Sequence, residues 1–173
     1  LIARWSQNEM TKEILEESAT GSRKLTVGAP MDGRVVSVEK SDMILLSKEN
    51  ELHVVPTNEI LHTPMTSIDP RYKTSVIEWS PSPQTLISEN PDAIEDMINR
   101  GALSAAAQAV GVAQKLLDMT VSYVSERKQF GKPVGTNQAV KHHCSDMAIA
   151  VEFARPLVQV ASWAIDNERS PTE

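Results

Sequence analysis

The sequence predicts an α+β protein in which a small antiparallel β domain precedes the long antiparallel helices of a helical-bundle domain. The first observation is a series of short β-branched and apolar runs, bounded by Gly, Pro, Asp and Asn, before residue 90. The second is a change to helical periodicity after that residue. We therefore divide the chain into a lead-in at 1–21, a β domain at 22–89 and an incomplete helical-bundle domain at 90–173.

The lead-in and the β domain have different local patterns. Residues 8–21 contain helix formers followed by glycine, which favours a short helix, with a disordered lead-in as the alternative. Val36 and Val38 alternate with polar neighbours, as in a strand with one buried face, whereas the run "MILLS" at 43–47 is apolar enough to be buried on both faces. Strands are expected near 24–28, 34–38, 42–47, 51–56 and 73–79.

Two long helices are expected after residue 90, at about 92–127 and 136–167. The first has Asn90 as a cap candidate and Pro91 at its first position, with acids in its first turn and bases in its last. The second begins with Thr136 as its cap and contains Pro156, which predicts a kink. The apolar faces expected from the three-and-four spacing are Leu103, Ala106, Ala107, Val110, Ala113, Leu117 and Val124, then Val140, Met147, Val151, Ala154, Val158 and Ala161.

Composition limits the classes of protein that fit. With 40% hydrophobic residues among 173, the chain can bury a core. Its net charge of −6 argues against nucleic-acid binding through a broad basic surface. A single cysteine excludes a disulfide framework, and no apolar run is expected to span a membrane, so we expect a cytoplasmic protein. The missing initiator methionine suggests a fragment, and helical faces too large for the chain to cover suggest other subunits or further parts of the chain.

The segment that connects the two helices contains charged, polar and aromatic residues that a simple helix hairpin does not require. A helix hairpin needs a glycine after the first helix and a cap before the second. The stretch "YVSERKQFGKPVGTNQAVKHHCSDMA" at 123–148 also carries Arg127, Lys128, Gln129 and Phe130. In a purely structural interpretation, Arg127 interacts with the helix dipole and Phe130 packs into the fold. The functional interpretation is that these residues bind a ligand.

The sequence of this connection resembles the acyl-CoA dehydrogenase family. The resemblance lies at 102–150, in a G-x-A element, a Y-x-x-x-R-x-x-F-G element and a Q-A-x-x-H-x-x-A/S-D-M element. Their counterparts in this sequence are Gly111–Ala113, Tyr123–Gly131 and Gln138–Met147. More weakly, "SDMILL" at 41–46 and "DPRYKTSVIEW" at 69–79 resemble strands of the family's middle β domain.

This resemblance implies flavin-dependent α,β-dehydrogenation of an acyl-CoA thioester, as in the β-oxidation of fatty acids or steroid side chains. It implies FAD bound between the subunits of a homo- or hetero-oligomer, expected to be a tetramer, with an acceptor such as an electron-transfer flavoprotein. Arg127 would bind the pyrophosphate and Phe130 would cover the adenine side of the cofactor. The expected cofactor residues are Arg127, Gln129, Phe130, Val134, Asn137, Gln138 and Val140.

The catalytic base is not found in this sequence. The family's early glutamate position falls at Gly101, and the arginine usual beside it falls at Ala102, while Glu95 and Asp96 are more simply first-turn residues. The chain is therefore part of a dehydrogenase whose base lies elsewhere, or an inactive partner in a mixed tetramer. A non-enzymatic helical oligomerisation module is the rival, and a flavin-dependent oxidase shares the same motifs. No metal site is expected, because adjacent residues of "HHCSD" at 142–146 point different ways on a helix.

Overall fold

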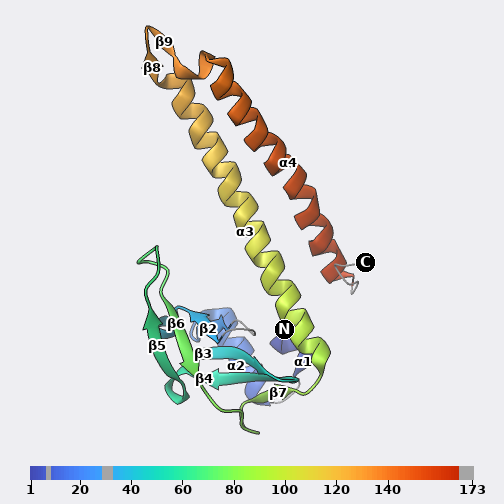
Figure 1. The fold of residues 1–173 in the computed structure, drawn as a ribbon. Coiled ribbons are helices and arrows are strands. Elements are labelled where there is room, and N and C mark those ends of the chain that lie inside the picture. The colour runs from blue at the N-terminus through green and yellow to red at the C-terminus, as the bar shows by residue number, and fades with distance from the viewer. Residues whose placement is uncertain (7–8, 29–32, 168–173) are drawn as a thin grey trace. The chain divides into compact units, whose positions relative to one another are not determined.

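The computed structural model describes residues 1–6, 9–28 and 33–167, which form two compact units, Leu1–Ile98 and a second that begins at Asn99. The first unit contains α1 (Ile2–Trp5), α2 (Glu9–Thr20), β1 (Leu25–Val27), β2 (Arg34–Val36), η1 (Val38–Lys40), β3 (Met43–Lys48), β4 (Glu51–Pro56), η2 (Thr57–Glu59), β5 (Leu61–Met65), β6 (Thr74–Glu78) and β7 (Leu86–Ser88) (Figure 1). Helix α3 (Pro91–Glu126) begins in the first unit and continues into the second, which also contains β8 (Lys128–Gln129), β9 (Lys132–Pro133), η3 (Val134–Thr136) and α4 (Gln138–Asp166).

The α+β class is confirmed, and the first unit contains two sheets. Their strand orders are β1-β3-β4-β7 and β2-β6-β5. All the pairs are antiparallel except β1 with β3, which are parallel, so the expectation of a wholly antiparallel domain is wrong at this pair. Strands β5 and β7 were not expected. The first contains Pro64 and is exposed throughout, and the second has only three residues, so neither shows an alternating apolar pattern.

Strand β3 is buried on both faces, as its continuous apolar run predicts. Met43 and Leu45 pack in one hydrophobic cluster, together with residues of α1, α2 and the first turns of α3. Ile44 and Leu46 pack in the other, together with residues of the second sheet. Successive side chains of a strand point to opposite faces, so each face of the sheet around β3 has its own core.

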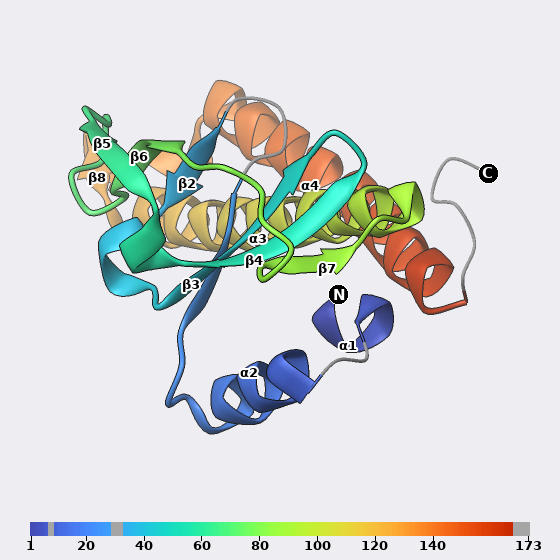
Figure 2. The same ribbon diagram turned by 90° about the horizontal axis from the view of Figure 1, so that it is seen from below.

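The N-terminal helices belong to the core of this unit. Helix α2 confirms the expected helix up to Gly21, whose φ of 77° ends it, while residue 8 lies outside the described residues. Figure 2 shows α1 and α2 on one side of the β3–β4 sheet, where Ile2 and Ile14 are buried. The indole Nε1 of Trp5 donates to Asp96 Oδ2 over 2.9 Å. Helix α1 was not expected, because four residues are too short to show a helical period.

The two long helices were predicted to within two residues at each end. Asn90 Oδ1 accepts from the backbone N–H of Asp92 over 3.0 Å, which confirms Asn90 as a cap before Pro91. The expected bases are absent from the last turn, because α3 ends at Glu126 and Arg127 follows it. Helix α4 has Asn137 as its N-cap, so Thr136 is not the cap. Pro156 lies inside α4, which continues past it to Asp166.

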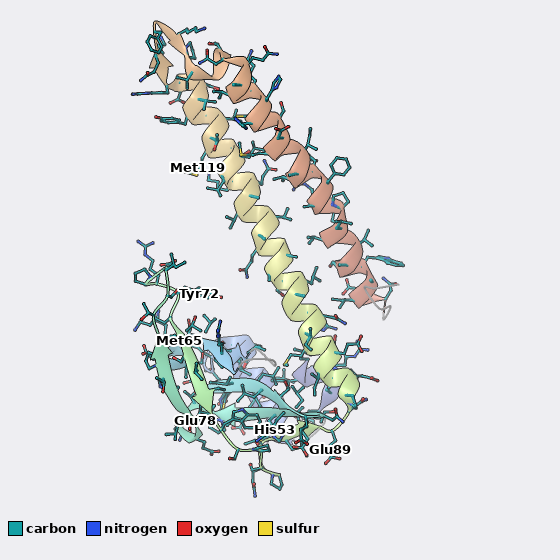
Figure 3. The ribbon with its side chains drawn as sticks, in the orientation of Figure 1. His53, Met65, Tyr72, Glu78, Glu89 and Met119 are labelled. Carbon is teal, nitrogen blue, oxygen red and sulfur yellow. The ribbon has the colours of Figure 1, made fainter. Side chains whose placement is uncertain are left out.

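A single seam joins α3 to α4 in the second unit. The half-buried or buried positions recur every three to seven residues, at Leu103, Val110, Ala113, Leu117 and Val124 on α3 and at Val140, Cys144, Val151, Val158 and Ala161 on α4. In the middle of the seam, Arg155 Nη2 donates to Gln114 Oε1 over 2.7 Å. Figure 3 shows Met119 of α3 pointing away from α4. Large apolar side chains outside the seam are exposed, among them Val112, Leu116, Met119, Phe153, Leu157 and Val160.

Helix α4 corrects one expectation from the sequence. It is long and apolar enough to cross a membrane, although no apolar run was expected to reach that length. One such helix is weak evidence for a membrane span, because a core helix of a helical bundle has the same length and composition.

Replacing Ile44 by alanine is expected to lower the free energy of unfolding by about 2–5 kcal/mol, because the side chain is 0% exposed and the replacement leaves a cavity between the two sheets. Leu61→Ala is the matched control: this leucine lies in the same unit but is 73% exposed, so the expected change is within about 0.5 kcal/mol. Chemical denaturation of both variants checks this, and equal losses would contradict the assignment of the core.

The exposed apolar faces of α3 and α4 predict that the chain associates through helix-to-helix contacts into a dimer or a tetramer. Light scattering at micromolar concentration measures the mass directly. A compact monomer would contradict this prediction.

Candidate functional site

The candidate site is the connection between α3 and α4, and a two-residue hairpin forms its tip. Strands β8 and β9 pair antiparallel, with Lys128 opposite Pro133 and Gln129 opposite Lys132 (Figure 1). Phe130 and Gly131 make the turn, with φ of 51° and 81°. Positive φ at both central positions is the pattern of a type I′ turn, whose twist matches that of paired strands.

Phe130 has both an unusual backbone conformation and an unusual exposure for a large aromatic residue. A left-handed backbone is uncommon for a bulky side chain and costs about 1–3 kcal/mol. The side chain is also 99% exposed, so no packing within the chain compensates for that cost. Residues that break local preferences without local compensation are concentrated at functional sites. The interpretation of Phe130 as a packing residue within its own chain is therefore wrong.

The hairpin is tied to the helices at its base. The backbone N–H of Arg127 donates to Tyr123 O over 2.9 Å, and that of Val134 donates to Arg127 O over 2.8 Å. In η3, the Thr136 hydroxyl donates to Pro133 O over 2.7 Å. These bonds hold the backbone of the connection in one conformation.

The residues expected to bind a cofactor fall into two groups. Arg127, Gln129 and Phe130 lie together on the hairpin, and all three side chains are exposed. Among the described residues, the Arg127 guanidinium has no ion-pair partner, so its donors are available to a ligand. The hairpin therefore combines a permanent cation, an amide and an aromatic ring on one short segment.

The second group lies where η3 leads into α4. Val134 is half-buried in η3, and Asn137 caps α4 without a hydrogen bond from its side chain. Gln138 is the first residue of α4, and its Nε2 lies 3.4 Å from His142 Nε2. Val140 is half-buried and faces the groove described next.

An apolar groove, here called the hairpin groove, lies between the end of α3 and the start of α4. It has a volume of about 540 Å³. Its lining residues are Val121, Val124, Ser125, Pro133, Gly135, Thr136, Val140, Lys141, Cys144 and Ser145. The groove is more apolar than the exposed hairpin, so the connection has one polar side and one apolar side.

Gly135 is a residue of this connection that sequence reasoning missed. A Cβ at this position would lie 2.9 Å from Val124 O, which is closer than van der Waals contact allows. The only signal in the sequence is a glycine in "VGT" at 134–136, and a glycine there is explained equally well by an ordinary turn.

The positions where the family's early glutamate and its neighbouring arginine fall carry no ionisable side chain. Gly101 has no side chain and Ala102 has no ionisable group. Asp96 is half-buried and accepts the hydrogen bond from Trp5, and Glu95 is exposed one residue earlier. In the described ranges 1–6, 9–28 and 33–167, no three His, Cys, Asp or Glu residues are grouped as metal ligands.

Comparison with known proteins places residues 92–173 in the family described as acyl-CoA dehydrogenase, C-terminal domain. An acyl-CoA dehydrogenase of Mycobacterium tuberculosis is 33% identical over 124 residues, which are 70% of this chain and 17% of that protein. The glutaryl-CoA dehydrogenase of Desulfococcus multivorans is 46% identical over 72 residues, 42% of this chain and 18% of that protein. The chain thus covers less than a fifth of either relative.

The fold agrees with this sequence relationship. A crystal structure of glutaryl-CoA dehydrogenase from Mycobacterium smegmatis superposes with a TM-score of 0.80 at 17% identity, covering 98% of this chain and 54% of that chain. At that identity the superposition shows similarity of fold alone, and it extends over the β region as well as the helices. The chain therefore belongs to the acyl-CoA dehydrogenase family, and its residues 92–173 correspond to the C-terminal domain of that family.

Proposed function

We propose that this chain supplies the FAD-binding turn of an acyl-CoA dehydrogenase that works as an oligomer in the cytoplasm. The observation that carries the proposal is Phe130, a fully exposed aromatic residue held in a left-handed turn beside Arg127 and Gln129. Flavin-dependent oxidation is general in this family, and an acyl-CoA thioester is the corresponding substrate class.

The residues of the hairpin fit the chemistry of FAD. A guanidinium without an ion-pair partner can give two parallel hydrogen bonds to pyrophosphate oxygens. An exposed aromatic ring can stack on the adenine, and such stacking is worth about 1–3 kcal/mol per base. The Gln129 amide can both donate and accept hydrogen bonds. When bound, FAD would accept a hydride from the β-carbon of the acyl chain.

The exposed hairpin favours a cofactor shared with another subunit. Phe130 at its tip is 99% exposed, and the side chains of Arg127 and Gln129 are exposed as well. Phe130 would therefore contact a flavin held largely by a neighbouring chain. A homo- or hetero-tetramer is the proposed assembly, and an electron-transfer flavoprotein is the proposed electron acceptor.

A catalytically inactive subunit of a mixed tetramer is the second candidate. It is favoured by Gly101 and Ala102, which leave the family's early glutamate position without a carboxylate, and by the hydrogen bond between Trp5 and Asp96. A helical oligomerisation module that binds no flavin is the less favoured alternative, because such a module needs neither an unpaired Arg127 nor an exposed Phe130.

Arg127→Lys is expected to weaken flavin retention by the assembled protein by roughly one to two orders of magnitude. Lysine keeps the charge but loses the two-point contact, and one charge-assisted hydrogen bond is worth about 1.5–3 kcal/mol. The melting temperature should hardly change. The flavin-to-protein ratio is measured by absorbance, with Arg71→Lys as a control, because Arg71 lies between β5 and β6 and is exposed. Flavin content unaffected by Arg127→Lys would remove this residue from the site.

The chain expressed alone is expected not to oxidise acyl-CoA even when FAD is supplied, because no carboxylate is placed to remove the α-proton. Reduction of an artificial electron acceptor by a series of acyl-CoA thioesters checks this. Substantial turnover that disappears in Glu95→Gln would show that Glu95 is the base and that the alignment at Gly101 is wrong.

A further inference from the structure

Gly135 of the connection lies so close to Val124 of α3 that a side chain at position 135 would clash with it. A Cβ at Gly135 would lie 2.9 Å from the carbonyl oxygen, 3.1 Å from Cγ2 and 3.2 Å from the carbonyl carbon of Val124. Two of these three atoms belong to the backbone of a continuous helix and cannot rotate away. A side chain at 135 must therefore displace the connection.

Hydrogen bonds link the residues before and after Gly135 within the connection. Arg127 O accepts from Val134 N–H, which closes the base of the hairpin. Val134 O accepts from Asn137 N–H over 3.1 Å, and Pro133 O accepts from the Thr136 hydroxyl. A shift of Gly135 is therefore expected to shift Val134, and with it β9 and the tip of the hairpin.

We propose that Gly135 is a positioning residue, whose missing side chain sets the direction in which the hairpin presents Arg127 and Phe130. This inference rests on the proposed flavin-binding function, and Gly135 itself is not proposed to touch the flavin. Two-point recognition of a pyrophosphate depends on direction, because the guanidinium must present two parallel donors to the phosphate oxygens.

The test is Gly135→Ala in the full chain with its assembly, compared with Gly111→Ala. Gly111 lies in α3, and a Cβ there meets no atom within 4 Å. Gly135→Ala is expected to weaken FAD binding by about 10–100-fold, which corresponds to the loss of one charge-assisted hydrogen bond, while Gly111→Ala leaves it unchanged. In the flavin-free chain, the amide chemical shifts of residues 127–132 should change along with those of 134–136 in Gly135→Ala.

Two further variants separate positioning from loss of structure. Val124→Ala removes Cγ2 but keeps the backbone atoms, so it should not restore flavin binding to Gly135→Ala. Thr136→Val removes the hydrogen bond to Pro133 O without adding a clash. It should also weaken flavin binding, but by less than Gly135→Ala does. Circular dichroism of each variant should show unchanged helical content, and the visible spectrum of the residual flavin should be altered in Gly135→Ala.

Normal FAD affinity in Gly135→Ala, or chemical-shift changes confined to 134–136 and Val124, would overturn the inference. Recovery of flavin binding when Val124→Ala is added to Gly135→Ala would also overturn it. The clash with the Val124 backbone would then not be the cause of the loss. A wild-type assembly that binds no FAD would instead refute the proposed function. The amide shifts of 127–132 would then show whether a side chain at position 135 alters the hairpin.

Discussion

The reversal of the chain between two long helices is the constraint on which the candidate site depends. Only two residues make the turn, and both need a positive φ, which Gly131 adopts readily and Phe130 does not. The hydrogen bond from the Val134 N–H to Arg127 O, and the closeness of Gly135 to Val124, restrain the connection that carries this hairpin. The same geometry holds an aromatic ring, a guanidinium and an amide on the outer side of the hairpin.

The long elements and the location of the site could be predicted from the sequence. Helix α3 has an N-cap, a proline at its first position and an apolar face, and β3 has a continuous apolar run that requires two buried faces. These are strong local signals. The motif around Arg127 and Phe130 also predicts that the connection is more than a link between helices. Whether each of its residues binds a cofactor stays a prediction.

Other features depend on contacts that no local pattern contains. Strand β5 is an exposed edge strand with a proline, and the parallel pairing of β1 with β3 is set by the tertiary fold. The cap of α4 was wrong by one residue, because the Thr136 hydroxyl bonds backward to Pro133 in η3. Gly135 could not be recognised because its role depends on the distance to Val124, eleven residues away in sequence.

The most direct measurement is hydrogen–deuterium exchange of the assembled full chain with and without FAD. If the connection binds the flavin, amides within 127–137 should exchange more slowly when FAD is added, while those of the exposed segment 66–73 between β5 and β6 should not change. Unchanged exchange at 127–137 in a protein that demonstrably holds FAD would contradict the assignment of this connection as the flavin-binding turn.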